Sequence, residues 1–447
     1  MQSDQGELRR VDREKEDGLF LDERLEDDPF AELDREPRRR PRPRQRRQRR
    51  RGRGEARALL RTDAGRLLVG AVTLLFAATL IGLIALWPPQ PHPSTPSQAF
   101  GGATLAATVD SASIVPCPGP VASDCRRIQV TPTEGPEAGK RESIDLGPVL
   151  STPNVSAGAH VRVLRVAALP GSTASAQVTY QFVDFDRRSS LLWLAVAFAA
   201  LVLVLARWRG LLALVGFAAS LLIVIRFLIP GILAGTSPLE VSLIGALAAM
   251  FTTLVLTSGF GVQTLAAALG IGASLLFATL LGDLWAHIAH LNGLTSELAI
   301  VLPQSGIHVS LQGIVIAGMV IGALGVLADM AVTQASAVMA LRKANPDLSA
   351  RALYRGAFAV GRDHLAATIN TLVLAYVGAA LPLLLILQGT GVGLADALNT
   401  QDVAEPIIAT LVGSIGLIAA VPLTTGLAAL LARRLPPAAL PEHLHAH

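Results

Sequence analysis

Charged side chains are scarce in this 447-residue chain, since Asp, Glu, Lys and Arg make up 16% of it while hydrophobic residues make up 51%. An ordinary soluble domain is about 25% charged, so these charges are too few to cover a water-facing surface. Two cysteines are also too few for a disulfide-dense secreted scaffold. The composition therefore excludes a single soluble globule and predicts a polytopic membrane protein.

Catalytic signatures are missing as well. The sequence contains no HExxH, paired CxxC, GxSxG or Walker A motif, and these patterns mark the common metal, nucleophile and nucleotide sites. Without a P-loop the chain cannot hydrolyse a nucleotide by that mechanism. We therefore expect no enzyme activity and no cofactor.

The charges that are present concentrate at the N-terminus. Residues 1–37 hold 14 acidic against 6 basic residues, and residues 38–61 hold 13 Arg against Glu55. Opposite charge blocks without apolar periodicity are typical of disorder, so residues 1–66 are predicted to be a disordered cytoplasmic tail. Because no aromatic residues interleave with the Arg run, we expect it to contact anionic lipid headgroups and not nucleic acid.

A first membrane span is predicted at 67–87, an uncharged stretch of about the ~20 residues that cross a bilayer. Residues 88–188 then lie outside the cytoplasm, as a linker followed by short alternating runs that predict an OB-like β-barrel of about five strands. Cys117 and Cys125 enclose a short loop there, and an oxidising exterior makes them a candidate disulfide.

The membrane domain is predicted over 189–434, followed by a disordered cytoplasmic tail at 435–447. With the first span its apolar stretches make eight α-helical spans, which places both termini in the cytoplasm. Nine of its ten Lys and Arg residues then fall on the cytoplasmic side, Arg226 being the exception, as the positive-inside rule requires. We therefore expect a multi-pass protein of the cell membrane. The seven apolar stretches lie near 190–206, 210–228, 239–257, 262–281, 309–332, 364–388 and 407–432.

Polar residues inside a membrane are costly, so each one is a candidate functional group. On the sixth span Gly318, Gly322, Gly325 and Asp329 recur on one helix face, and the small residues predict a close helix approach. The seventh span is entered through the sequence GRDHL, residues 361–365, and we expect both spans to share one polar cluster. Its members are Asp329, Gln334, Ser336, Arg362, Asp363, His364, Asn370 and Thr371.

Three interpretations of this cluster stay open. Its groups pair and cap helices to hold the bundle together, or they line a transport pathway in which a carboxylate beside His364 handles a proton or cation. In the third, Asp and His activate water or bind a metal. Elsewhere His287 and His290 have the spacing of some metal ligands, near Asp283, but an i, i+3 histidine pair is common by chance and we expect no metal site.

Two of the predicted connections between spans are longer than a simple link requires. The outer segment 282–308 is partly apolar and suits a re-entrant or interfacial segment. The inner segment 337–362 is predicted to be a loop with a short helix at 347–359, N-capped by Asp347 or Ser349. Arg351 and Arg355 lie on one side of that helix and are candidates for docking a cytoplasmic partner.

The stretches GALGVLADMAVTQASAVMAL, GRDHLAATINTLVLAYVGAALPLLL and LVGSIGLIAAVPLTTGLAALLARR resemble the YibE/F family of multipass membrane proteins. The resemblance covers roughly 105–434. It implies a permease-like membrane protein and supplies no catalytic residue. We therefore predict a permease-like transporter of a small solute or ion. The alternative is a membrane subunit that docks a cytoplasmic partner, for example an ATPase, through 337–362.

Overall fold

The computed structural model describes residues 63–88, 104–117, 123–166, 179–294 and 309–434. The N-terminal tail up to residue 62 and the tail from 435 onward lie outside these ranges, and so do the predictions of disorder made for them. The linker 89–103 also lies outside the described residues.

The first long helix, α2, is Asp63–Ala85 and consists almost entirely of apolar residues. It begins four residues before the predicted span, so residues 63–66, which were predicted to be disordered, are helical, and Arg66 pairs with Asp63 one turn away. Its hydroxyls are satisfied within the helix, since Thr79 donates to the carbonyl of Leu75 at 2.8 Å. Such bonding lets polar side chains sit in an apolar helix without unpaired donors.

Five antiparallel strands follow in the order β3-β2-β1-β4-β5, and β3 comes against β5 as the sheet curls into a half-barrel. Residues alternate between a buried and an exposed face, as the sequence pattern predicts. The register places Val109 opposite Val130, and both are buried in the same core as Val161 and Val163. The strands are Thr104–Pro116, Asp124–Pro132, Glu142–Pro148, His160–Val166 and Thr179–Phe185.

Two features hold this sheet together in addition to the hydrogen bonds between its strands. Cys117 and Cys125 form a disulfide that joins the end of β1 to the start of β2. Glu137 accepts a hydrogen bond from the Tyr180 hydroxyl, and Arg165 donates to it at 3.2 Å. The Tyr180 hydrogen bond and the Arg165 guanidinium lower the pKa of Glu137 from its ordinary value. The turn after β2 is thereby tied to β4 and β5.

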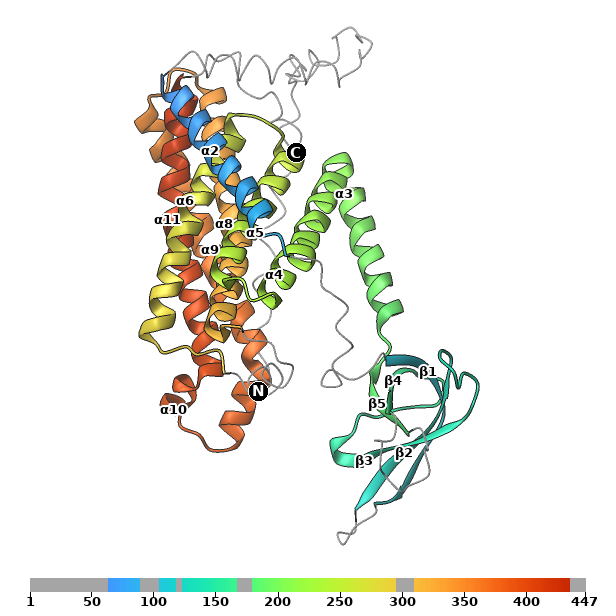
Figure 1. Ribbon diagram of the computed structural model, residues 1–447. Coiled ribbons are helices and arrows are strands. Elements are labelled where there is room, and N and C mark those ends of the chain that lie inside the picture. The colour runs from blue at the N-terminus through green and yellow to red at the C-terminus, as the bar shows by residue number, and fades with distance from the viewer. Residues whose placement is uncertain (1–62, 89–103, 118–122, 167–178, 295–308, 435–447) are drawn as a thin grey trace, which may run out of the picture. The chain divides into compact units, whose positions relative to one another are not determined.

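The helix α3, Arg188–Ile223, is bent sharply at Arg207, whose φ of 51° lies in the left-handed region. The bend divides the helix into two arms (Figure 1). Beside it, a Cβ on Gly210 would come within 2.5 Å of the Val202 carbonyl oxygen, so only glycine permits this close approach. The second arm continues through the π-helix η4, Val224–Leu228, into α4, Ile229–Leu233.

The remaining long helices form a bundle around α8, which packs against α5, α6, α9 and α11. Successive long helices of this bundle run in alternating directions (Figure 1). Its largest buried side chains include Leu275, Leu327, Met330 and Leu417. The helices are α5 Pro238–Ser258, α6 Val262–Ile288, α8 Leu311–Ala344, α9 Ala350–Gly389, the short α10 Leu394–Asn399 and α11 Gln401–Arg434.

The two ends of this bundle differ in charge. Arg342 donates to the carbonyl of Ala432 at 3.2 Å, and Arg433 donates to that of Leu348 at 3.2 Å, so the ends of α8 and α11 meet the start of α9. We call this the basic end. The opposite end, where α6 finishes and α5, α8 and α11 begin, contains Asp283 and the first-turn acids of α5 and α11, and we call it the acidic end.

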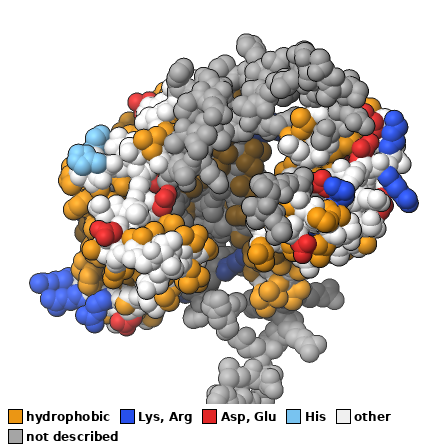
Figure 2. Space-filling model, turned by 90° about the horizontal axis from the view of Figure 1, so that it is seen from below, with side chains coloured by type: hydrophobic (Ala, Val, Ile, Leu, Met, Phe, Trp, Pro, Cys, Tyr) orange, Lys and Arg blue, Asp and Glu red, His pale blue; other side chains and the backbone are white. Residues whose placement is uncertain are grey.

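Seven helices among the described residues are long and apolar enough to cross a membrane, and one of them is the bent stretch Arg188–Leu233. Many large hydrophobic side chains of these helices are exposed, among them Leu74, Trp193 and Leu385, and some are visible in Figure 2. Large exposed apolar surfaces of this kind mark contact with lipid or another protein. The chain is therefore a multi-pass membrane protein. The predicted number of eight spans depends on whether the two arms of α3 cross separately.

The structure corrects the predicted inner loop. Residues 337–344 belong to α8 and residues 350–362 belong to α9, so a connection of residues 345–349 joins the two helices. Charged residues at these helix ends suggested a loop, but Lys and Arg are good helix formers and do not interrupt an apolar pattern. Ser349 is the N-cap of α9, accepting a hydrogen bond from the backbone N–H of Ala352 at 3.1 Å.

The predicted outer segment 282–308 is also divided. Its first residues complete α6, which ends at Ile288. Residues 295–308 lie outside the described residues, so the re-entrant or interfacial segment stays a prediction.

Candidate functional site

The glycine face of α8 is open in the structure. Among the described residues, a Cβ added to Gly318 or Gly325 would meet no atom within 4 Å, and one on Gly322 would meet only the Tyr376 hydroxyl, at 3.2 Å. The predicted close approach of another helix is therefore seen at Gly322, through Tyr376 of α9, and not at Gly318 or Gly325. Instead α8 buries its other faces against α6 and α11. The glycines leave an uncovered strip that leads along α8 to Asp329.

Asp329 and His364 meet across α8 and α9. The Asp329 Oδ2 lies 3.5 Å from the His364 Nε2, with 68% of the Asp329 side chain and 40% of the His364 side chain exposed. Asp329 precedes Arg342 by about 20 Å along the helix, at a rise of about 1.5 Å per residue. The pair thus lies in the apolar part of α8, away from the basic end and toward the middle of the bundle.

Gln334 occupies a different place, a buried junction of three helices. It is fully buried, and its Oε1 accepts a hydrogen bond from the Thr425 hydroxyl of α11 at 2.9 Å. Its amide lies against Gly361 of α9, where a Cβ would come within 2.5 Å of the amide nitrogen. We call Gln334, Gly361 and Thr425 the glutamine junction. It ties α8, α9 and α11 together.

The other predicted cluster members lie apart from the Asp329–His364 pair. Ser336 accepts a hydrogen bond from Gln263 of α6. Arg362, Asp363 and Asn370 are exposed, and no hydrogen bond or ion pair joins them to another described residue. The exposed Thr371 donates to the carbonyl of Ala367 within its own helix. The structure therefore separates the predicted cluster into a pair, a junction and exposed groups.

Sequence reasoning missed two contributors. Gln263 lies near the start of α6, and its side-chain amide donates a hydrogen bond to Ser336 on α8. Thr425 lies in α11, and no sequence pattern connects it with Gln334. Pairing between helices depends on their packing, which periodicity along one helix does not reveal.

The weak metal candidates are not assembled into a site. Among the described residues there is no group of three or more His, Cys, Asp or Glu side chains that could hold a metal ion. His287 contacts Asp283, its Nδ1 lying 2.7 Å from the Asp283 carbonyl oxygen. His290 follows the end of α6 with a φ of 52°. Glu297 and His308, which follow this pair in the sequence and could also supply ligands, lie outside the described residues.

Long apolar helices with a polar pair between two of them define a multi-pass membrane protein. The family is shown directly, because the YibE/F-like protein family matches residues 194–434, more than half of the chain. The chain belongs to this family. The match begins inside α3, so it covers the helices from there onward and not the sheet that the resemblance was expected to include. Comparison with curated proteins and with solved structures gives no match.

Proposed function

We propose that the protein is a permease-like transporter of a small solute or ion in the cell membrane. The observation that carries the proposal is the Asp329–His364 pair, which joins two helices long enough to span a bilayer. Ionisable side chains are costly at membrane depth and are retained mostly where they act. Imidazole changes charge closest to neutral pH of all side chains, so beside a carboxylate it can exchange a proton during transport.

The uncovered glycine strip supports the same function. It borders Asp329 on α8 and faces open space at Gly318 and Gly325. A pathway for a small solute needs such unfilled volume next to polar groups, whereas a pair with a structural role would normally be enclosed by its neighbours. No catalytic step and no cofactor form part of the proposal.

For the topology we propose eight spans, with the two arms of α3 crossing separately and both termini in the cytoplasm. The arm 188–206 is about 28 Å long at about 1.5 Å per residue, close to the ~30 Å of a hydrocarbon core. Under the positive-inside rule the basic end faces the cytoplasm, where the Arg-rich tail would contact anionic lipid headgroups and not nucleic acid. The curled sheet then lies outside, as a partly open barrel of OB type.

Reconstituted protein tests transport. In liposomes containing a pH-sensitive dye, the wild type is expected to move protons together with a co-supplied solute from a panel of small ions and metabolites. Asp329→Asn and His364→Gln each remove one partner of the pair and are expected to lower this flux about tenfold or more, typical of losing a proton-transfer group. Asp363→Asn, one residue away and exposed, is the matched control and should retain it.

Two results would contradict the proposal. Wild-type vesicles that move nothing faster than empty ones would remove the transport function. Full flux in Asp329→Asn, with normal elution from a sizing column, would leave transport standing but remove the pair from it.

A second function is favoured by the start of α9. Arg351 and Arg355 are exposed one turn apart, and Arg362 is exposed further along the same face. In this alternative the protein is a membrane subunit that binds an acidic surface of a cytoplasmic ATPase. Arg351→Glu with Arg355→Glu would then abolish co-purification of the ATPase, while Arg434→Glu at the same end would not. Co-purification unchanged by the double charge reversal counts against this docking surface.

A further inference from the structure

The membrane-crossing part of α9 packs on the bundle along one side only. Among the described residues none of its most apolar stretch is buried, whereas half or more of the corresponding stretch is buried in α5, α6, α8 and α11. The side that packs carries Gly361, His364 and Tyr376, each of which lies against α8. The opposite side of α9 therefore has no partner within the described part of the chain.

Asn370 lies on this unpartnered side. It follows Gly361 by nine residues, which is two and a half turns at about 3.6 residues per turn, so the two point in opposite directions. The Asn370 side chain is exposed, and its carboxamide makes no hydrogen bond to another described residue. Because it points away from α8, it belongs neither to the open glycine strip nor to the Asp329–His364 pair.

Asn370 also lies at membrane depth. Residues 365–387 of α9 contain no charged side chain and form its crossing part. Asn370 is six residues from His364 and six from Tyr376, so it lies midway between two contacts with α8, about 9 Å along the helix from each. The hydrocarbon core contains no water to bond a carboxamide there. Side-chain amides at this depth form hydrogen bonds to another helix.

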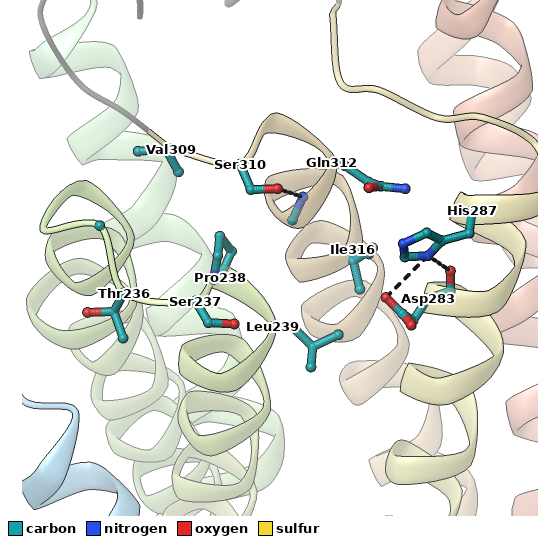
Figure 3. A pocket seen from close by; sticks show the side chains of 12 residues that line it. Thr236, Ser237, Pro238, Leu239, Asp283, His287, Val309, Ser310, Gln312 and Ile316 are labelled. Atoms are coloured by element: carbon teal, nitrogen blue, oxygen red, sulfur yellow. Dashed lines mark hydrogen bonds and ion pairs between the residues drawn. The ribbon is translucent and has the colours of Figure 1, made fainter.

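Exposed polar groups at the ends of the bundle have no such need. A pocket of about 380 Å³ lies at the acidic end, among the starts of α5 and α8 and the end of α6 (Figure 3). Asp283 and His287 line it and contact each other, with the His287 Nδ1 3.6 Å from the Asp283 Oδ1. They lie in the last turns of α6, where water can complete their hydrogen bonds. Asn370 has neither a neighbouring polar group nor a position at a helix end.

The residues around Asn370 have the spacing of a seam between two helices. Ala366, Asn370, Val373 and Val377 are separated by alternating steps of four and three residues, and all four are exposed. This is the a and d spacing of a coiled coil, in which a single Asn at an a position fixes the register of the pair. The small Ala366 permits close approach of a second helix. We call these four residues the outer seam.

We propose that α9 pairs through the outer seam with α9 of a second copy of this chain. Two copies with the same orientation in a membrane are related by a two-fold axis along the membrane normal, so their α9 helices run parallel and each seam residue lies opposite its own equivalent. A carboxamide both donates and accepts, so Asn370 and its equivalent satisfy each other. A different membrane protein would need a matching polar group at the same depth.

The charged residues before the seam are complementary in the same arrangement. Arg362 and Asp363 are both exposed, and no ion pair joins either to another described residue. Asp363 precedes Asn370 by seven residues, so it occupies the previous a position. In a parallel pair the residue before an a position flanks the a position of the other helix. Arg362 of each copy is thus beside Asp363 of the other and offsets the approach of the two carboxylates.

Disulfide trapping in the membranes of expressing cells tests the pairing, which does not depend on transport. Both native cysteines are held in one disulfide, so Val377→Cys adds one free thiol per copy, on the outer seam. After oxidation by copper phenanthroline in air, most of the chain is expected to run as a covalent dimer on a non-reducing gel. Ala375→Cys is the matched control, exposed at nearly the same depth but on the other side of the helix. It should give about a tenth as much dimer, because its Cα atoms lie too far apart for a disulfide.

Asn370→Leu tests the hydrogen bonds between the two copies. The dissociation constant of the dimer is measured in lipid vesicles, by energy transfer between labelled copies as the protein is diluted. It is expected to rise about tenfold, typical of losing hydrogen bonds between membrane helices. Thr371→Ala is the control and should leave the constant unchanged, because the Thr371 hydroxyl donates to the Ala367 carbonyl within its own helix.

Each result decides one part of the proposal. No covalent dimer from Val377→Cys, or equal trapping from Ala375→Cys, would overturn the pairing. A crosslinked product whose mass is not twice that of the chain would assign the outer seam to a different membrane protein and overturn the second copy. A dissociation constant unchanged by Asn370→Leu would remove Asn370 from the contact. A trapped dimer in protein that moves no solute would leave the pairing in place and remove transport.

Discussion

Gly361→Ala is expected to lower the free energy of unfolding by about 2–4 kcal/mol, the sum of overpacking in a tight core and a weakened buried hydrogen bond. A methyl group on Gly361 would lie 2.5–2.7 Å from the amide atoms of Gln334. Gln334 is fully buried, so its amide has no exposed position to move into. Displacing it also disturbs the 2.9 Å hydrogen bond from Thr425. Unfolding by SDS in mixed micelles, followed by far-UV circular dichroism, measures the change.

Gly378→Ala is the matched control on the same helix. A Cβ there would meet no atom of the described residues within 4 Å, and alanine is a better helix former than glycine by about 1 kcal/mol. The control is therefore expected to be neutral or slightly stabilising. If both variants unfold at the same SDS fraction, the glutamine junction does not depend on the close approach at Gly361.

Gly270→Ala is expected to be the more damaging change, at about 3 kcal/mol or above, the upper range for overpacking. The added Cβ would lie 2.0 Å from the Thr424 Oγ1 and 3.2 Å from the Thr424 Cα. Because backbone is part of the clash, rotating the Thr424 side chain cannot relieve it. The helices α6 and α11 would have to separate along the line where Gly270 faces Thr424. The same SDS titration measures the loss.

The variant Thr424→Ala separates the contribution of the Thr424 hydroxyl to this clash from that of the rest of the residue. The Thr424 hydroxyl is buried and has no hydrogen-bond partner among the described residues, so removing it alone should cost less than Gly270→Ala. In the double variant some stability should return, but not all of it, since the Thr424 Cβ would still lie 2.9 Å from the new methyl. Additive effects of the two changes would mean that the two positions are not in contact. Gly325→Ala, in open space on α8, is the glycine control.

These two glycines show how the helices of the membrane domain come close together where they cross. Lipid is as apolar as a leucine side chain, so helices in a bilayer associate through close packing and hydrogen bonds. Gly270 and Gly361 each bring a backbone against a polar side chain of the next helix. On the open strip of α8, Gly318 and Gly325 have no such neighbour among the described residues, and there the small residue leaves space.

Much of the architecture could be predicted because it depends on chemistry repeated along the chain. Apolar stretches predicted every long helix of the bundle, and alternation in 104–185 predicted five strands. The pairing of Cys117 with Cys125 followed from their short separation and matches the disulfide in the structure. Helix ends were predicted less well, as at 337–362, because a charged residue at a membrane boundary does not end a helix.

The composition of polar residues on α8 and α9 is a property of the sequence, and so is the sorting of charge between the two ends of the bundle. Which of those polar residues meet is decided by the tertiary structure. Asp329 contacts His364 on α9, whereas Gln334 bonds Thr425 on α11. The partners differ because nearby positions on one helix face different neighbours when several helices pack around it. Periodicity determines which face a residue occupies. Only packing decides what lies opposite that face, and at Asp329 it is His364 beside open space.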